Sequence, residues 1–213
     1  MFSKELLDKI TKSKIVAGFS VQNLDDAVPI AKSLMEGGIN VIELTLRTKN
    51  SLKAVEMIAK SVQDMVIGVG TILTTDQLFQ VKNNGAHFGV SPGLNKRVLQ
   101  YADEIDFSFA PGIATPSDLD CAIDMGYRFV KFFPAEGMGG VNYLKSISAP
   151  FNHLDVKYFP LGGINSNNMN EYLNIDNVIA IGGSWIVKDQ LVLNKQWKEI
   201  TKRALEVRNI INN

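Results

Sequence analysis

The segment Val41-Ile42-Glu43-Leu44-Thr45-Leu46-Arg47 has the pattern of a buried β-strand with one unusual face. Side chains alternate between the two faces of a strand, so the three even-numbered residues form a wholly aliphatic face. Glu43, Thr45 and Arg47 share the opposite face. An aliphatic face suits packing against helices, which leaves the polar face for the interior of a curled sheet. A simple ion pair between Glu43 and Arg47 is the alternative interpretation of that face.

Short apolar segments of this kind alternate along the chain with stretches in which apolar residues recur at helical spacing. The expected strands are Lys14–Ser20, Asn40–Arg47, Met65–Thr71, His87–Pro92, Phe107–Gly112, Arg128–Pro134, Val156–Gly163 and Val178–Trp185. Strands that are apolar on both faces and alternate with helices predict a parallel sheet covered by helices. Eight such units predict an α/β fold of the (β/α)8 TIM-barrel type. An open doubly wound sheet is the alternative, but Gly18-Phe19-Ser20 is not its usual glycine-rich dinucleotide loop.

Local signals set the expected ends of the helices. Thr74-Thr75 and Thr115-Pro116 precede helical stretches as capping residues, and glycines follow others at Gly37-Gly38, Gly85 and Gly126. An extra helix at 4–11 is expected to close the floor of the barrel, and 191–213 is expected to be the last helix. The absence of a linker or low-complexity tract predicts a single domain over residues 1–213.

The composition allows an enzyme and disfavours several other classes of protein. Of 213 residues, 46% are hydrophobic and 21% charged, and 22 basic side chains balance 22 acidic ones, so no nucleic-acid or membrane partner is expected. The single Cys121 has no partner for a disulfide within the chain. No secretory signal or bilayer-length apolar run is seen, so a cytoplasmic location is expected.

Lys131 lies in the middle of Arg128–Pro134, which otherwise has the pattern of a buried strand. Removing an ammonium group from water is costly, so burial favours the free amine that attacks carbonyl groups in Schiff-base chemistry. The alternative is a lysine whose head reaches solvent at the strand end. Lys131 is expected to point into the same interior as Glu43 and Arg47. An amine, an acid–base carboxylate and an arginine are the minimum set for imine chemistry on a keto acid.

Two pairs of glycines end the seventh and eighth expected strands. They are Gly162-Gly163 and Gly182-Gly183, the second followed by Ser184. Barrels commonly build a phosphate site from backbone N–H groups after these two strands, although tight turns also need glycine. Thr71 after the third strand and the Pro92 turn after the fourth are expected at the same rim.

The two histidines, His87 and His153, lack ligand-like spacing with Asp, Glu or Cys, so no metal site is expected. No cofactor is expected either.

Several motifs together resemble the 2-keto-3-deoxy-6-phosphogluconate (KDPG) and 4-hydroxy-2-oxoglutarate (KHG) aldolase family. The resemblance runs in chain order from about strand one to strand eight, and its motifs are Ile42–Thr48, Gly68–Thr71, Ser91–Gly93, Pro111-Gly112, Lys131–Glu136, Gly162–Ile164 and Gly182–Trp185.

The resemblance implies a metal-free class I aldolase on a (β/α)8 barrel, usually a homotrimer, acting on a small 2-keto acid. It implies that Lys131 forms the Schiff base and that Glu43 transfers protons. It further implies that Arg47 and Thr71 hold the pyruvyl carboxylate beside Pro92, and that a phosphate pocket is formed by Gly162, Gly163, Gly182, Gly183 and Ser184.

Two residues depart from the pattern of the family. Leu161 stands where many members carry Thr, and Ser20 stands where many carry Arg. Both positions are near the expected distal end of the substrate. The galactonate epimer, 4-hydroxy-2-oxoglutarate or another 2-keto-3-deoxy acid therefore stay open as substrates. The rival classes are a phosphate-binding barrel isomerase or synthase, and a sugar-phosphate binding barrel without catalytic activity.

Overall fold

The computed structural model describes residues 2–212 and shows an α/β fold with parallel strands. The strands are β1 (Ile15–Phe19), β2 (Val41–Thr45), β3 (Val66–Gly70), β4 (Phe88–Val90), β5 (Phe109–Ala110), β6 (Gly112–Ile113), β7 (Phe129–Phe132), β8 (Lys157–Pro160) and β9 (Ile181–Gly183). One sheet has the order β5-β4-β3-β2-β1-β9 and the other the order β6-β7-β8. Parallel bridges from Tyr158 to Val178 and from Leu161 to Gly182 connect the two sheets.

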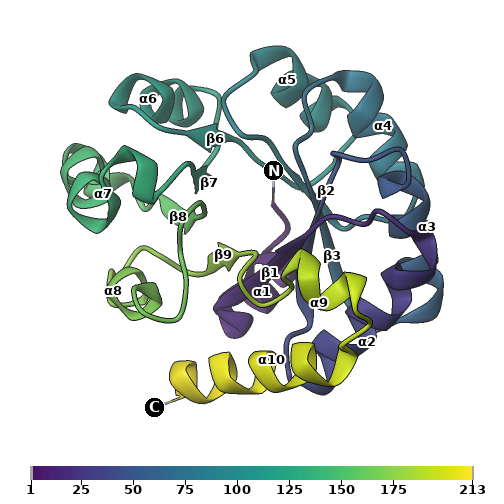
Figure 1. Cartoon of the computed structure of the whole chain (residues 1–213). Helices are drawn as coiled ribbons and strands as arrows, with labels where there is room; N and C mark the ends of the chain where they lie inside the picture. Colours follow the sequence, from purple (N-terminus) through teal and green to yellow (C-terminus); the bar gives the residue numbers. More distant parts are fainter. Residues whose placement is uncertain (1, 213) are drawn as a thin grey trace.

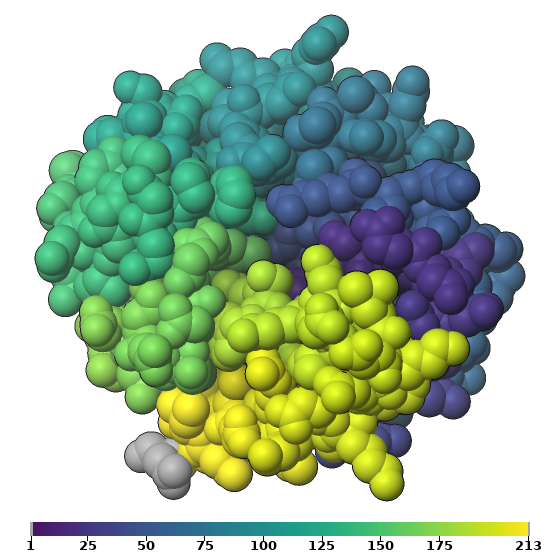
Figure 2. Space-filling model, in the orientation of Figure 1, coloured from purple at the N-terminus to yellow at the C-terminus, as the bar shows by residue number. Residues whose placement is uncertain are grey.

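The helices surround the strands, as Figure 1 shows. They are α1 (Lys4–Ser13), α2 (Ala27–Glu36), α3 (Ser51–Ser61), α4 (Thr75–Asn83), α5 (Lys96–Glu104), α6 (Pro116–Asp124), α7 (Gly140–Ser148), α8 (Met169–Leu173), α9 (Asp189–Leu193) and α10 (Trp197–Asn212), with 3-10 turns η1 (Leu24–Asp26), η2 (Glu136–Met138) and η3 (Ala149–Leu154). The space-filling view shows the first (purple) and last (yellow) parts of the chain in contact, consistent with the pairing of β1 with β9 (Figure 2).

The sequence signals for helix ends are confirmed. Thr74 and Thr115 are N-caps of α4 and α6, and each forms a capping box with the side chain three residues later. Gly38, Gly85 and Gly126 follow helices with φ of 79°, 90° and 89°, the left-handed region that glycine adopts without steric cost.

Two predicted elements differ from the structure. The expected strand Phe107–Gly112 is divided at Pro111 into β5, which pairs with β4, and β6, which pairs with β7. Proline has no backbone N–H to donate, so a continuous ladder cannot pass through it. The expected last helix 191–213 is two helices, because Lys195 has a φ of 52° between α9 and α10, and residue 213 lies outside the described residues.

The core has an outer and an inner part. The larger cluster fills the space between strands and helices, and the smaller one lies inside the curl of the strands. Leu6 and Ile10 of α1 join the inner cluster, and the ring of Phe2 contacts the rings of Phe88 and Phe129 at centroid distances of 5.7 and 4.8 Å. The N-terminal segment therefore covers the end of the strands opposite to their carboxyl ends. No helix within residues 2–212 is long and apolar enough to cross a membrane.

Replacing His87 with Gln should reduce the loss of stability at acidic pH. The Nδ1 atom of His87 accepts a hydrogen bond from the Ile67 N–H at 3.0 Å. Desolvation of the ring and the nearby Lys9 ammonium lower the pKa of His87 from its ordinary 6.5. Stability contributed by the neutral ring is therefore complete above about pH 6.5 and decreases as the pH falls, because the unfolded chain takes up the proton more readily.

The measurement is the melting temperature of wild type and His87→Gln between pH 7.5 and 5.5. We expect the melting temperature of the wild type to fall more over this range than that of the variant, because a glutamine side chain does not titrate there. Equal falls in melting temperature would show that His87 does not contribute to the loss of stability at acidic pH.

Candidate active site

A cavity of about 630 Å³ opens at the carboxyl ends of the strands. Eight of the ten residues that the sequence predicted for the site line it: Glu43, Arg47, Lys131, Gly162, Gly163, Gly182, Gly183 and Ser184. Thr71 and Pro92 do not, although they follow β3 and β4 at the same end of the sheet. The cavity therefore joins residues from β2, β7, β8 and β9, as expected for parallel strands whose carboxyl ends meet.

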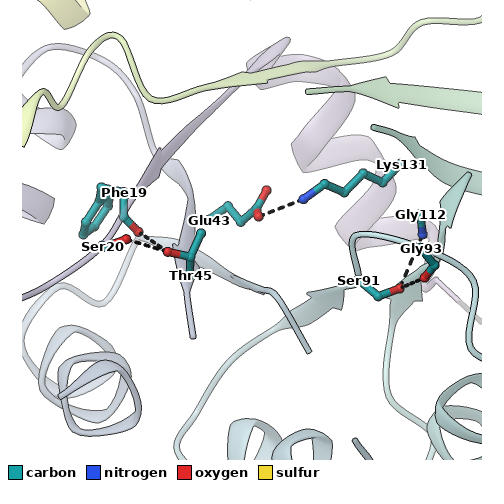
Figure 3. A network of polar contacts seen from close by, with 8 residues as sticks. All are labelled: Phe19, Ser20, Glu43, Thr45, Ser91, Gly93, Gly112 and Lys131. Atoms are coloured by element: carbon teal, nitrogen blue, oxygen red, sulfur yellow. Dashed lines mark hydrogen bonds and ion pairs between the residues drawn. The ribbon is translucent and has the colours of Figure 1, made fainter. Parts of the chain in front are cut away.

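Lys131 and Glu43 form a buried ion pair at the base of the cavity (Figure 3). Lys131 Nζ lies 3.0 Å from Glu43 Oε1, and the two residues are only 5% and 2% exposed. Buried charges are tolerated in proteins when they are paired, so each side chain makes the burial of the other possible. The second oxygen of Glu43, Oε2, is buried without a hydrogen-bond partner in the described structure. It is therefore free to bind a water molecule or a substrate group.

Glycine creates the space that Glu43 occupies. Gly70 on β3 lies beside Thr45 in the register, and a Cβ added to it would lie 1.9 Å from Glu43 Oε1. Any larger residue at this position would displace the carboxylate. On the other side of the pair, Lys131 Nζ lies 5.1 Å from the centre of the Phe133 ring, a distance at which an ammonium group is attracted to an aromatic face.

Hydroxyl groups occupy the wall between β1 and β2. Ser20 Oγ and Thr45 Oγ1 are 2.7 Å apart, and Thr45 also donates to the Phe19 carbonyl at 3.4 Å (Figure 3). The side chain of Arg47 is exposed and makes no hydrogen bond or ion pair with the rest of the described chain, although its backbone N–H donates to the Thr45 carbonyl at 2.9 Å. Its guanidinium group is available to an anionic ligand.

The Gly162-Gly163 turn has the backbone of an anion site. Both residues are left-handed, with φ of 100° and 87°. The side-chain amides of Asn165 and Asn168 donate to the Gly163 carbonyl at 3.2 and 3.4 Å. The N–H groups of Gly163 and Ser184 donate to no other group of residues 2–212. Backbone N–H groups without partners in a cavity are suited to bind phosphate or carboxylate oxygens.

The second glycine pair also has a packing role that the sequence analysis did not recognise. A Cβ on Gly182 would lie 2.6 Å from the side chain of Leu161, and a Cβ on Gly183 would lie 1.8 Å from the ring of Trp185. These glycines therefore allow two large side chains to cover the strand.

Thr71 and Pro92 are held beside the pair rather than in the cavity wall. Thr71 has a φ of 64°, which is strained for a β-branched residue. Ser91 donates to the Gly93 carbonyl at 2.6 Å and accepts from the Gly112 N–H at 3.4 Å, as Figure 3 shows. Because Gly112 is in register with Lys131, this turn is fixed next to the lysine strand.

Several residues that line the cavity were not predicted as site residues from the sequence, namely Phe133, Trp185, Lys188 and Asp189. Phe133 could have been identified from its position two residues after Lys131 on the same face. Lys188 and Asp189 follow the last strand, where no periodic pattern indicates which side chains face the cavity. Among residues 2–212 no group of three or more His, Cys, Asp or Glu side chains could hold a metal ion.

A buried lysine is paired with one carboxylate at the carboxyl ends of parallel strands, beside backbone N–H groups that have no partner among the described residues, and this arrangement suits an enzyme that uses amine chemistry. The family model for KDPG and KHG aldolases matches residues 6–203. The chain belongs to this family of aldehyde-lyases.

Individual relatives are similar over nearly the whole chain. A 2-dehydro-3-deoxy-phosphogluconate aldolase of Haemophilus influenzae is 36% identical over 98% of both chains, and a KHG/KDPG aldolase of Escherichia coli K12 is 41% identical over 92% of both.

Among solved structures, a KDPG aldolase of Legionella pneumophila has a TM-score of 0.92 at 38% identity, covering 97% of this chain and 99% of its own. In that structure pyruvate was captured as a covalent carbinolamine intermediate. A KDPG aldolase of Zymomonas mobilis with 3-phosphoglycerate has a TM-score of 0.81 at 34% identity, covering 92% and 94% of the two chains.

Replacing Gly70 with Ala should remove most of the activity without unfolding the protein. The added methyl group occupies the position of Glu43 Oε1. Displacing a proton-transferring carboxylate is expected to lower turnover by ~10²–10⁴-fold. The measurement is kcat, with the far-ultraviolet circular dichroism spectrum as a check of folding. Full activity in Gly70→Ala would contradict the geometry described for Glu43.

Proposed function

We propose that this protein is a class I aldolase that cleaves 2-keto-3-deoxy-6-phosphogluconate reversibly to pyruvate and glyceraldehyde 3-phosphate. The observation that carries the proposal is the buried contact of 3.0 Å between Lys131 Nζ and Glu43 Oε1 in a cavity with an anion-binding rim. Membership of the aldolase family supports the same reaction. Cleavage of 4-hydroxy-2-oxoglutarate to pyruvate and glyoxylate is a second activity, in line with the KHG/KDPG relative from Escherichia coli.

The mechanism begins with transfer of a proton from Lys131 to Glu43, which is within hydrogen-bond distance. The free amine adds to the C2 ketone, and Glu43 returns its proton to the hydroxyl group of the carbinolamine, which leaves as water. The resulting iminium nitrogen accepts the electron pair when the C3–C4 bond breaks. Glu43 takes the proton of the C4 hydroxyl group and later returns a proton to C3 of the enamine. Hydrolysis then releases pyruvate and restores Lys131. The iminium ion itself is the electron sink, so this route uses no cofactor.

The two ends of the substrate are assigned to opposite sides of the cavity. Arg47, with Thr71 and the Pro92 turn beside it, holds the pyruvyl carboxylate. The distal phosphate binds at the rim formed by Gly162, Gly163, Gly182, Gly183 and Ser184. The unpaired N–H groups of Gly163 and Ser184 and the exposed Arg47 support this orientation.

For the fold, the number of domains, the oligomeric state and the location, we follow the resemblance to the aldolase family. The two sheets close into a (β/α)8 barrel, which the bridge from Leu161 to Gly182 supports. The chain forms one domain and assembles as a homotrimer in the cytoplasm.

Replacing Glu43 with Gln should lower kcat much more than it changes KM. The amide keeps the size of the carboxylate but cannot accept the proton, so turnover should decrease by ~10²–10⁴-fold. A coupled assay of pyruvate release measures it. Lys131→Arg keeps the charge but forms no Schiff base, and it should release no pyruvate above background. An isomerase or synthase that used the same glycine rim would tolerate both changes, and that outcome would reject the aldolase mechanism.

The substrate is tested by pyruvate release from phosphorylated and unphosphorylated forms of both C4 epimers. We expect the phosphogluconate-derived substrate to have the highest kcat/KM. Leu161→Thr restores a hydroxyl group that many family members carry, and one added hydrogen bond should raise this value on the order of fivefold. Leu161→Val is the matched control, because it shortens the side chain without a hydroxyl group. An equal response to both variants would show that position 161 does not recognise the distal end through a hydrogen bond.

A further inference from the structure

Glu136 contacts the Gly162-Gly163 turn from outside the cavity. It is the first residue of η2, its backbone N–H donates to the Gly162 carbonyl at 2.9 Å, and it does not line the cavity itself. A Cβ added to Gly163 would lie 2.6 Å from both Cβ and Cγ of Glu136. The Glu136 side chain therefore lies directly against the Gly163 Cα atom.

Tyr172 of α8 holds this side chain in place. Its hydroxyl group donates a hydrogen bond to Glu136 Oε1, and Tyr172 is fully buried. Burial raises the pKa of Tyr172 far above 10, and the hydrogen bond to Glu136 raises it further, so the phenol keeps its proton as a donor. This is the only hydrogen bond of the Glu136 carboxylate to other described residues.

The same contact keeps the Glu136 carboxylate beside the first residue of α7. A Cβ on Gly140, the first residue of α7, would lie 3.2 Å from Glu136 Oε1 and 3.5 Å from the Tyr172 hydroxyl oxygen. The carboxylate therefore lies at the N-terminus of α7, where the helix dipole favours a negative charge. A carboxylate that could rotate freely next to the Gly163 N–H group would repel a phosphate bound there.

We propose that Tyr172 and Glu136 are positioning residues for the anion rim, with Tyr172 keeping the Glu136 carboxylate against Gly163 and turned away from the substrate phosphate. The proposal rests on the proposed function, because it assumes that the rim binds the phosphate of the substrate. Neither residue touches the reacting atoms. Their effect is therefore expected on binding of the phosphorylated substrate and not on the chemistry at Lys131.

Two reactions separate these effects in the purified full-length protein. Cleavage of 2-keto-3-deoxy-6-phosphogluconate requires the rim, whereas exchange of the pyruvate methyl protons with deuterated water requires only the amine and the acid–base group. Tyr172→Phe should raise KM for cleavage on the order of tenfold at low ionic strength, and less in high salt, because salt screens the released charge. The rate of pyruvate exchange should stay at the wild-type value.

Adding Glu136→Gln to Tyr172→Phe should restore KM, because the amide carries no charge. Tyr143→Phe is the matched control, since the Tyr143 hydroxyl group forms no hydrogen bond within residues 2–212 and its loss should leave KM unchanged. If Tyr172→Phe does not fold, the comparison of Glu136→Ala with Glu136→Gln takes its place. Glu136→Ala removes the side chain that lies against Gly163 and should raise KM. Glu136→Gln keeps a side chain of the same size there and should leave KM unchanged.

The proposal is overturned if KM is unchanged in Tyr172→Phe, if exchange and cleavage decline together, or if Glu136→Gln fails to restore KM. A wild-type protein that exchanges no pyruvate protons would instead reject the proposed function.

Discussion

The buried ion pair between Lys131 and Glu43 sets the strictest requirements on the strands and residues around it. The two residues are 88 positions apart in the chain, on β7 and β2, and both are almost completely buried. Two charges can be held in such a place only if they are paired in good geometry, because each is costly to remove from water. The strands supply that rigidity, and the absence of a side chain at Gly70 supplies the space. Glu43 Oε2 is an acceptor that no group among residues 2–212 uses.

The second constraint is the shape of the glycine turns at the cavity rim. Gly162 and Gly163 line the cavity with left-handed backbone, and their carbonyl groups are held by the Glu136 N–H and two asparagine amides. The rim is therefore supported from outside by residues that never reach the cavity. Under the proposed function, this division separates the support of the glycine rim from the support of the Lys131–Glu43 pair.

Most of the site could be predicted from the sequence, because strand alternation places Glu43 and Lys131 on interior faces and eight of the ten expected residues line one cavity. The break at Pro111 and the short β9 could not be predicted from apolar runs alone, since apolar residues continue on both sides of each boundary. The packing of Trp185 over Gly183 and the hydrogen bond from Tyr172 to Glu136 leave no periodic signal. Such contacts depend on the tertiary fold.

The most direct test of this account is to reduce the protein with borohydride in the presence of pyruvate and to map the modified peptide by mass spectrometry. The account predicts that one reduced pyruvyl group is added per chain, and that it is found on Lys131. An adduct on a different lysine, or no adduct under conditions in which the protein cleaves its substrate, would contradict it.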